Sequence, residues 1–369
     1  MIGYQIWIKG PLPSWQQPGP YPALVDVVWW PLRWVHGNVN VFWVLGWTAP
    51  TTILACVILW RTAARPRAAV GLWLLAAALL ERSYWLKLEP LAAVMVLGAL
   101  VAVRNRRTAL SGLLLSLAAM IKVWPALVAP LVAGTAPSRS RFRWSVWFAV
   151  PWVTLVAVAA IWQPPAVTTW LTFAATRRIQ LESLTALGPL WAIAAGDHSW
   201  HVEFAQGLDW TYLMVGPWLD WIHLAVEVVG LTVLDLVGLR YYRYVRAGRG
   251  TARAVDELQT ALYLQLVILL VVICAGAVFS PQYLFWVAPV LVVAVGGGLL
   301  RRESLIWLLG CLLTTATYPI LHEGVVNAEP PALIVLTARD AAIVWLLAVC
   351  LRNLWRLTAP TSGEPALTS

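Results

Sequence analysis

The sequence has 369 residues, of which 60% are hydrophobic and only 12% are charged. Soluble domains carry about 25% charged residues, so this composition excludes an ordinary soluble globular protein. The formal net charge is +9, but the basic residues stand in short clusters between long apolar runs. That pattern is typical of a membrane protein with several spans, and it argues against a nucleic-acid partner.

The first 38 residues are rich in proline and predict an extended entry, followed by a short amphipathic helix at Leu24–Val35 that carries Asp26. The charge distribution described below places this segment outside the cell, although no apolar run precedes it to carry it across the membrane. We therefore expect a further helix upstream. The alternative is that a short tail crosses without a leader.

About 20 mostly apolar residues cross the hydrocarbon of a bilayer, or fewer where a helix is bent. The sequence predicts an all-α transmembrane bundle that forms one domain over residues 1–358, with short amphipathic helices on its outer loops and a disordered cytoplasmic tail at 359–369. About nine spans are expected, near residues 39–60, 68–81, 89–103, 145–162, 217–239, 258–279, 284–300, 304–321 and 331–351.

The run at residues 109–134 is apolar, but Lys122 and Pro125 interrupt it and arginine clusters flank both of its ends. Positive residues collect in short cytoplasmic loops, so a single crossing would place one cluster on the wrong side. Two half-helices that enter and leave on the cytoplasmic face resolve the conflict. Such broken helices are tolerated where they are buried in protein or line a wet cavity, so we expect a re-entrant helical hairpin here.

With this hairpin, 18 of the 26 Lys and Arg residues fall on the side of the C-terminus and six fall on the opposite side. The C-terminal side is therefore expected to be cytoplasmic. Ten of the 17 acidic residues and all five histidines lie outside or in the outer part of a span, which places titratable chemistry on the extracytoplasmic face. There, residues 163–216 form the longest polar stretch, with helices expected around Ala166–Arg178 and Ser183–Ala195.

Ionisable groups inside a membrane are costly, so each one is a candidate for function. Lys122, at the turn of the hairpin, is suited to hold a lipid-linked phosphate; alternatively it reaches the interface or forms a structural ion pair. Arg339 lies midway along the last span, beside Asp340. Adjacent residues on a helix point in different directions, so the two are not expected to form a self-contained salt bridge. We expect Arg339 to face the bundle interior and an anionic partner, which is either a ligand or a structural partner.

Three outer segments carry further candidates. Arg177 and Arg178 stand close to Glu182, a set that suits a phosphate head group and a polar sugar, or else a solvated face. The segment Glu81–Pro90 lines the mouth of a cleft or anchors two helix ends. His322, at the outer end of a span, is either a base near neutral pH or an ordinary loop residue.

No metal or other cofactor is expected. Asp220, His223 and Glu227 share one helix face, but no second motif supports a metal ion. The four cysteines lie inside apolar runs without paired spacing, which predicts neither disulfides nor zinc. The segment Gly296–Gly298 lies inside an apolar span and predicts close helix packing instead of a phosphate loop.

Together these features resemble an integral-membrane glycosyltransferase of the GT-C class, and more narrowly glycosyltransferase family 87, the actinobacterial mannosyltransferases that use polyprenyl-phosphate mannose. Four stretches carry the resemblance: Ser111–Leu115 leading to Ile121–Pro125, Arg178–Ser183, Phe279–Trp286, and Arg339 in the final span. The resemblance covers most of the chain from residue 4 onward, and the order of the stretches supports it.

The resemblance implies transfer of a hexose, mannose in this family, from a polyprenyl-phosphate-sugar donor to an extracytoplasmic glycolipid or glycan acceptor at the cell membrane. It implies that no cofactor takes part. In this sequence the donor phosphate would be held by Lys122, Arg177, Arg178 and Arg339. Contacts with the acceptor or the sugar would come from Glu182, Gln282 and Tyr283.

The catalytic base is where this sequence departs from the family. The family has an outer-loop Asp a few residues before a Tyr. The stretch Tyr4–Trp7 resembles the segment on the C-terminal side of that Asp, so the Asp itself would fall at Met1 or earlier. The bases visible in the sequence are Asp26, Glu89 and His322.

Two other functions stay open. A lipid or sugar transporter or flippase would also use buried cations and a broken helix, although the sequence shows no inverted repeat. A non-catalytic partner in cell-envelope assembly would not need a catalytic Asp.

Overall fold

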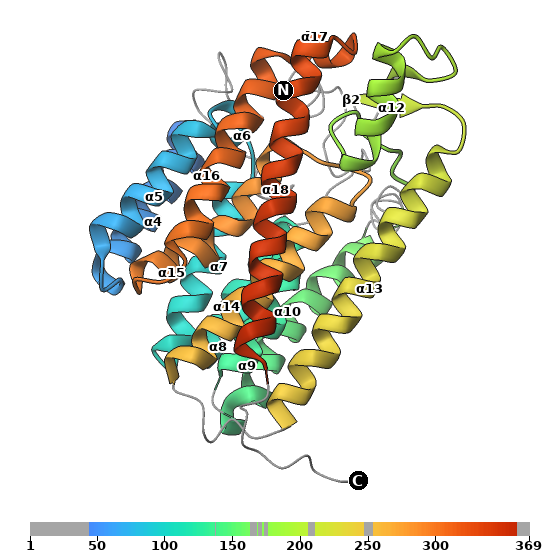
Figure 1. The fold of residues 1–369 in the computed structure, drawn as a ribbon. Coiled ribbons are helices and arrows are strands. Elements are labelled where there is room, and N and C mark those ends of the chain that lie inside the picture. Colours follow the sequence, from blue (N-terminus) through green and yellow to red (C-terminus); the bar gives the residue numbers. More distant parts are fainter. Residues whose placement is uncertain are drawn as a thin grey trace, which may run out of the picture.

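The computed structural model describes residues 44–136, 138–162, 168, 172, 176–205, 211–246 and 254–359. The predictions for the helix at Leu24–Val35, for Asp26, for most of the helix around Ala166–Arg178 and for nearly all of the tail lie outside the described residues. Within them the protein is a mostly helical bundle (Figure 1).

Each apolar run expected to span the membrane forms helix in the described part of the chain. Proline stands in the first turn of many of these helices, where its missing N–H costs no hydrogen bond. The helices are η3 (Val44–Thr48), α4 (Ala49–Thr62), α5 (Pro66–Leu79), α6 (Arg82–Trp85), α7 (Glu89–Arg104), α8 (Thr108–Ile121), η4 (Trp124–Val128), α9 (Ala129–Thr135), η5 (Ser138–Ser140), α10 (Arg141–Trp162), α12 (Leu184–Ala194), α13 (Leu219–Arg246), α14 (Ala254–Ala275), η6 (Pro281–Val287), α15 (Ala288–Gly296), α16 (Arg301–Thr315), η7 (Ala316–Ile320), α17 (His322–Val326) and α18 (Pro330–Leu357).

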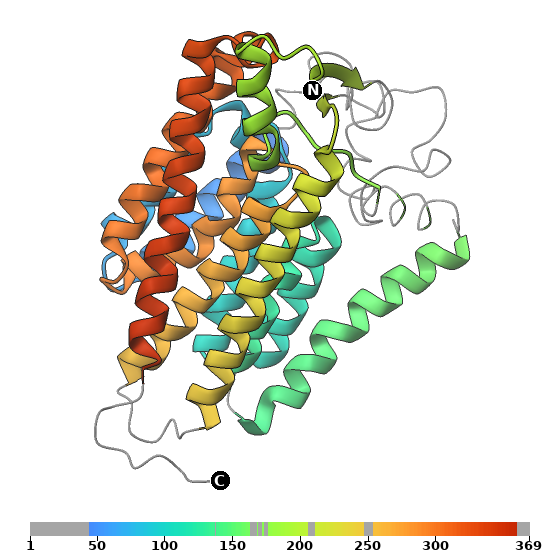
Figure 2. The same ribbon diagram turned by 45° about the vertical axis from the view of Figure 1, so that its right-hand side comes forward.

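Within the described ranges, four helical segments are long and apolar enough to cross a membrane, namely Leu219–Arg246, Glu257–Ala275, Arg301–Ile320 and Pro330–Leu357. They differ in burial. The segment from α14 is largely buried inside the bundle. The yellow helix α13 lies at its surface, at the right in Figure 1 and in front in Figure 2, and apolar side chains along its length are exposed. Extended apolar surface of this kind indicates contact with lipid or protein. The protein is therefore a helical membrane protein.

An aromatic cluster fixes the position of η6. The ring of Phe285 lies 4.9 Å from that of Trp73 in α5 and 4.7 Å from that of Tyr84 in α6, both edge-to-face. The Tyr84 hydroxyl accepts a hydrogen bond from Trp73 Nε1 at 3.1 Å and shares one of 2.6 Å with Thr52 Oγ1 of α4. Because its polar atoms are paired, this buried cluster holds the segment that contains Gln282 and Tyr283 without a desolvation penalty.

The chain turns back at Lys122. α8 ends at Ile121, Lys122 itself is extended (φ −146°, ψ 140°), and η4 begins with Pro125 in its first turn. A Cβ atom on Gly112 of α8 would lie 2.5 Å from the carbonyl oxygen of Trp144 in α10, so the beginnings of these two helices touch there. The chain between them therefore runs out along α8 and returns through η4 and α9.

A two-stranded antiparallel sheet lies at one end of the bundle, beside α12. β1 (His201–Ala205) pairs with β2 (Thr211–Val215), with His201 opposite Val215. The sequence predicted only helices for residues 163–216. The strands were missed because each has only five residues: the alternation of polar and apolar side chains in β1 is too short to stand out, and β2 does not alternate. The helix predicted at Ser183–Ala195 is confirmed as α12. We call the end of the bundle that carries this sheet, α6, α12 and α17 the sheet end (Figure 1).

The span expected at 284–300 ends four residues early. α15 stops at Gly296, and Gly298 has a positive φ of 86°, a conformation that glycine adopts without strain. The guanidinium of Arg65 lies over Gly298, so closely that a Cβ atom there would be 2.9 Å from Arg65 Cζ. The glycine run thus ends the helix and lets the turn between α4 and α5 pack onto it.

Candidate functional site

Three segments that are distant in the sequence meet at the sheet end. The backbone of residues 177–183 runs along the outer edge of β2, with hydrogen bonds from Leu181 N to Tyr212 O and from Met214 N to Ile179 O, both 3.0 Å. On its other side, Gln180 N donates to Ala277 O at 2.8 Å, just before η6. The third segment is the middle of α18. The fold thereby brings the predicted outer-loop motif, the Phe279–Trp286 motif and Arg339 together.

Arg339 of α18 is fully buried and is the closest link between these segments. Its Nη2 donates to the backbone carbonyl of Glu182 at 2.5 Å, and its guanidinium lies 4.1 Å above the ring of Phe279. It also pairs with Asp340, whose Oδ1 accepts from Nη2 at 2.7 Å and from Nε at 2.9 Å. The expectation that Arg339 would not pair with its neighbour was wrong, because the long arginine side chain folds back along the helix.

The buried pair keeps unused hydrogen-bonding capacity. Arg339 Nη1 and Asp340 Oδ2 are both buried without a hydrogen-bond partner. Buried ion pairs are usually satisfied on all sides, since an unpaired polar atom in a protein interior costs free energy. A donor and an acceptor thus remain for a polar group near Glu182 and Phe279.

Glu182 connects the buried arginine to His322. Its backbone oxygen accepts from Arg339, while its carboxylate Oε1 lies 3.5 Å from His322 Nδ1. The His322 ring stands edge-on to Tyr212 of β2 and to Tyr318 of η7, with centroids 5.4 Å and 5.0 Å apart. The His322 side chain is one-quarter exposed, and its ring lies beside a carboxylate and two aromatic rings.

A second ion pair lies at the break between α8 and η4. Lys122 Nζ is 3.2 Å from Glu89 Oε1, and the Glu89 carboxylate is fully buried whereas Lys122 is partly exposed. The structure thus gives Lys122 the ion pair that was one of its predicted roles. Because the Glu89 side chain has no exposed surface, it is better placed to orient the ammonium group than to meet a substrate.

Arg177 reaches the same region through aromatic side chains. Its Nη1 donates to the Tyr283 hydroxyl at 3.3 Å, and the Tyr283 ring packs 4.1 Å from that of Trp286. Trp286 in turn stacks on Trp124, two residues after Lys122, with centroids 5.8 Å apart. Both indole N–H groups are buried without a hydrogen-bond partner. This aromatic chain therefore joins Arg177 to the turn at Lys122 and leaves two buried indole donors without a partner.

Arg178 is directed elsewhere, to β1. Its Nη2 lies 3.1 Å from Glu203 Oε2, and both side chains are about half exposed. Neighbouring residues of an extended segment point to opposite sides, which explains why Arg177 and Arg178 do not act together. The hydrogen bond from Arg178, helped by its charge, lowers the pKa of Glu203 below its ordinary value.

The remaining predicted residues also have defined places. Gln282 is buried in η6 next to Tyr283, and His223 pairs with Glu227 at 3.2 Å while contacting Thr185. Among the residues that the structure describes, no group of three His, Cys, Asp or Glu side chains could hold a metal ion. Sequence reasoning missed Trp124, Trp286 and Phe279 as site residues, although all three lie in the stretches that carry the family resemblance.

Comparisons with protein-family models, with curated proteins and with solved structures found no match.

Proposed function

We propose that the protein is a membrane glycosyltransferase that moves a hexose, mannose by the family resemblance, from a polyprenyl-phosphate-sugar to an extracytoplasmic glycolipid or glycan. One observation carries the proposal. Arg177 and Arg339 each bind across to a segment far away in the sequence, Tyr283 and Glu182 respectively, at one end of a helical membrane protein. Cations, carboxylates and unsatisfied aromatic N–H groups gathered at one end suit a sugar with a phosphate leaving group.

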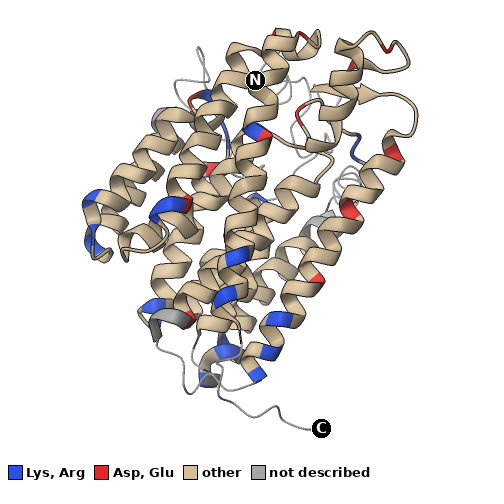
Figure 3. Cartoon of the chain, in the orientation of Figure 1, with Lys and Arg blue, Asp and Glu red and all other residues tan. Residues whose placement is uncertain are grey.

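The proposed topology has nine spans and a re-entrant hairpin at residues 109–134, with the sheet end outside and the C-terminus in the cytoplasm. Figure 3 supports this orientation, because lysines and arginines gather at the helix ends opposite the sheet end. Such an excess is typical of the cytoplasmic side. The return of the chain between the beginnings of α8 and α10 supports a hairpin that does not cross.

In the proposed reaction, Lys122 and Arg177 hold the phosphate of the donor. The bond between C1 of the sugar and the phosphate oxygen breaks, its electron pair stays on the phosphate, and the two cations stabilise that charge. The acceptor hydroxyl oxygen forms the new bond to C1. Its proton passes to Nε2 of His322, whose Nδ1 faces Glu182. Arg339 acts through Glu182 and is a positioning residue.

The sugar would lie against the aromatic chain of Trp124, Trp286 and Tyr283. A flat apolar sugar face stacks on such rings, while its hydroxyl groups can accept hydrogen bonds from the two buried indole N–H groups. Gln282 and the Glu182 carboxylate are the nearest further polar groups in the two adjoining segments.

Transfer from radiolabelled polyprenyl-phosphate mannose to membrane glycolipid tests the proposal. Membranes carrying the wild-type chain should form labelled product, and Arg177→Gln should reduce it by about 100-fold, as loss of a charge-stabilising donor does. The matched control is Arg243→Gln. Arg243 is an exposed arginine near the C-terminal end of α13. Equal transfer by wild type and Arg177→Gln would contradict the proposed role, and no transfer by any chain would contradict the reaction.

One observation favours a transporter as the second candidate. The Lys122–Glu89 pair stands at a helix break, as charged pairs do in many secondary transporters. Vesicles that take up a labelled lipid-linked sugar without forming product would support that function.

A further inference from the structure

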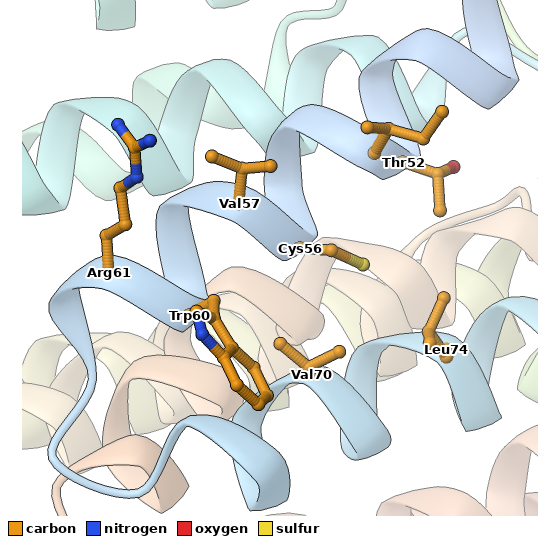
Figure 4. Close-up of a pocket in the computed structure, with 8 residues that line it drawn as sticks. Thr52, Cys56, Val57, Trp60, Arg61, Val70 and Leu74 are labelled. Carbon is orange, nitrogen blue, oxygen red and sulfur yellow. The ribbon is translucent and has the colours of Figure 1, made fainter.

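A groove runs along the outer faces of α4 and α5, on the side of the bundle away from the polar site. It encloses about 480 Å³ and is lined mainly by apolar side chains (Figure 4). Ile53, Val57 and Trp60 of α4 and Val70 and Leu74 of α5 line it, with Trp60 near the turn between the helices (Figure 4). Ile53, Val57 and Leu74 are all exposed, so the groove opens outwards. An apolar channel with this opening suits a hydrocarbon chain.

One end of the groove is strongly cationic. Arg61 lines it, Arg65 follows in the turn between α4 and α5, and Arg67 lies in the first turn of α5. All three are exposed, and no acidic residue lies between Trp60 and Ala69. Arg104 joins them, since its Nη1 donates to the Thr62 carbonyl at 3.5 Å. The turn is held in place by a 2.9 Å hydrogen bond from Arg65 N to Gly296 O. A fixed cationic cluster therefore stands at the mouth of an apolar groove.

We propose that this groove binds an anionic phospholipid of the bilayer, with one acyl chain along Val57 and Leu74 and its phosphate on Arg61. Basic pockets beside transmembrane helices recognise anionic head groups in this way, and arginine matches phosphate geometry. The Trp60 indole beside the arginines suits the level of the head groups. The lipid site does not depend on the proposed glycosyl transfer.

The position of the charges separates this lipid from a glycosyl donor. The opposite end of α4 is next to Thr48, whose hydroxyl donates to Trp85 O of α6 at the sheet end. A donor must place its phosphate near Lys122 and Arg177, whereas a lipid in this groove places its phosphate at the other end of α4. The chain in the groove therefore belongs to a lipid with its head group on the side opposite the sheet end.

Native mass spectrometry of the full chain tests the proposal. The protein is mixed in detergent with dioleoyl phosphatidylglycerol or with dioleoyl phosphatidylcholine, and the lipid that stays bound after the detergent is removed is counted. Wild type should retain one phosphatidylglycerol. Arg61→Gln should lower that occupancy about fivefold, which is the effect expected when one cation that contacts an anionic lipid is removed. Val57→Trp should abolish it by filling the groove while keeping every arginine. Arg243→Gln and Val229→Trp are the controls, on an exposed arginine and an exposed apolar side chain of α13.

Equal retention of the two lipids by wild type, or full retention by both groove variants, would overturn the proposal. A second measurement needs no variant. Phosphatidylglycerol with a photoactivatable group in its acyl chain should label peptides of α4 and α5. Labelling confined to other helices, displacement of the label by polyprenyl phosphate but not by phosphatidylglycerol, or crosslinks between two copies through α4 would each contradict the assignment.

Discussion

Arg339 donates a 2.5 Å hydrogen bond to the backbone carbonyl of Glu182, which lies 157 residues earlier in the chain. The contact fixes the loop of residues 177–183 onto the middle of α18. Because the carboxylate of the same Glu182 lies 3.5 Å from His322, the buried guanidinium helps to position the group beside the proposed base. The contact between Arg339 and Glu182 thereby couples the stability of the sheet end to the geometry of the site.

Replacing Arg339 by Met should destabilise the protein by about 3–5 kcal/mol, since it leaves the Asp340 carboxylate buried without its partner. Thermal unfolding in detergent measures the loss. The double variant Arg339→Met with Asp340→Leu should recover most of the stability but not the transfer activity, because Glu182 still lacks its donor. Recovery of activity in the double variant would contradict a positioning role for Arg339.

Exchange of Lys122 for Met should abolish transfer with a smaller effect on donor binding, since the ammonium group is assigned to the charge that forms on the phosphate. Glu89→Gln should lower the rate less, by about tenfold, because it only loosens Lys122. Initial rates at several donor concentrations separate the rate constant from KM. The assignment fails if Glu89→Gln is the more damaging change.

Trp286→Phe keeps an aromatic ring at the stacked position but removes the indole N–H together with one ring of the indole. We expect KM for the donor to rise by about five- to tenfold with little change in kcat, as loss of one hydrogen bond to a bound sugar would produce. Leu291→Ile, a buried conservative change in the adjoining α15, is the matched control. An unchanged KM in Trp286→Phe would remove the indole from the proposed sugar contacts.

Substitutions of Arg177 and Arg178 should have very different effects on glycosyl transfer. Arg178→Gln should lower transfer much less than Arg177→Gln does, because Arg178 pairs with Glu203 on β1. The same change should raise the pKa of Glu203 toward its ordinary value of 4.5. In the native protein the stabilising contribution of this pair is present above that value and is lost as the pH falls through the lowered pKa of the folded state. Carboxyl NMR of labelled glutamate in both proteins measures the difference, and an identical Glu203 titration would contradict it.

The sequence predicted the helical architecture because long apolar runs have few other solutions in a membrane. The break at Lys122 followed from one cation inside an apolar run and from Pro125, and α12 followed from its apolar run. The short sheet was missed because its two strands are stabilised by pairing with each other and with Gln180. The periodicity of the sequence does not reveal such pairing.

The site was predictable residue by residue but not as an arrangement. Lys122, Arg177 and Arg339 could be singled out as ionisable groups in unusual surroundings, and Tyr283 by the family resemblance. Arg177 contacts Tyr283, whereas Arg178 contacts Glu203. This difference depends on the path of an extended loop beside β2. The Arg339–Asp340 pair could not be inferred from helix geometry alone, because it depends on the flexibility of the arginine side chain in a closed interior.

The most direct measurement uses the purified protein in liposomes that contain polyprenyl-phosphate mannose labelled in the sugar and a membrane glycolipid acceptor. We predict that label moves from the donor to the acceptor, with polyprenyl phosphate released in equal amount, and that Arg177→Gln reduces both products together. A contradiction would be label that stays on the donor in the presence of correctly folded wild-type protein.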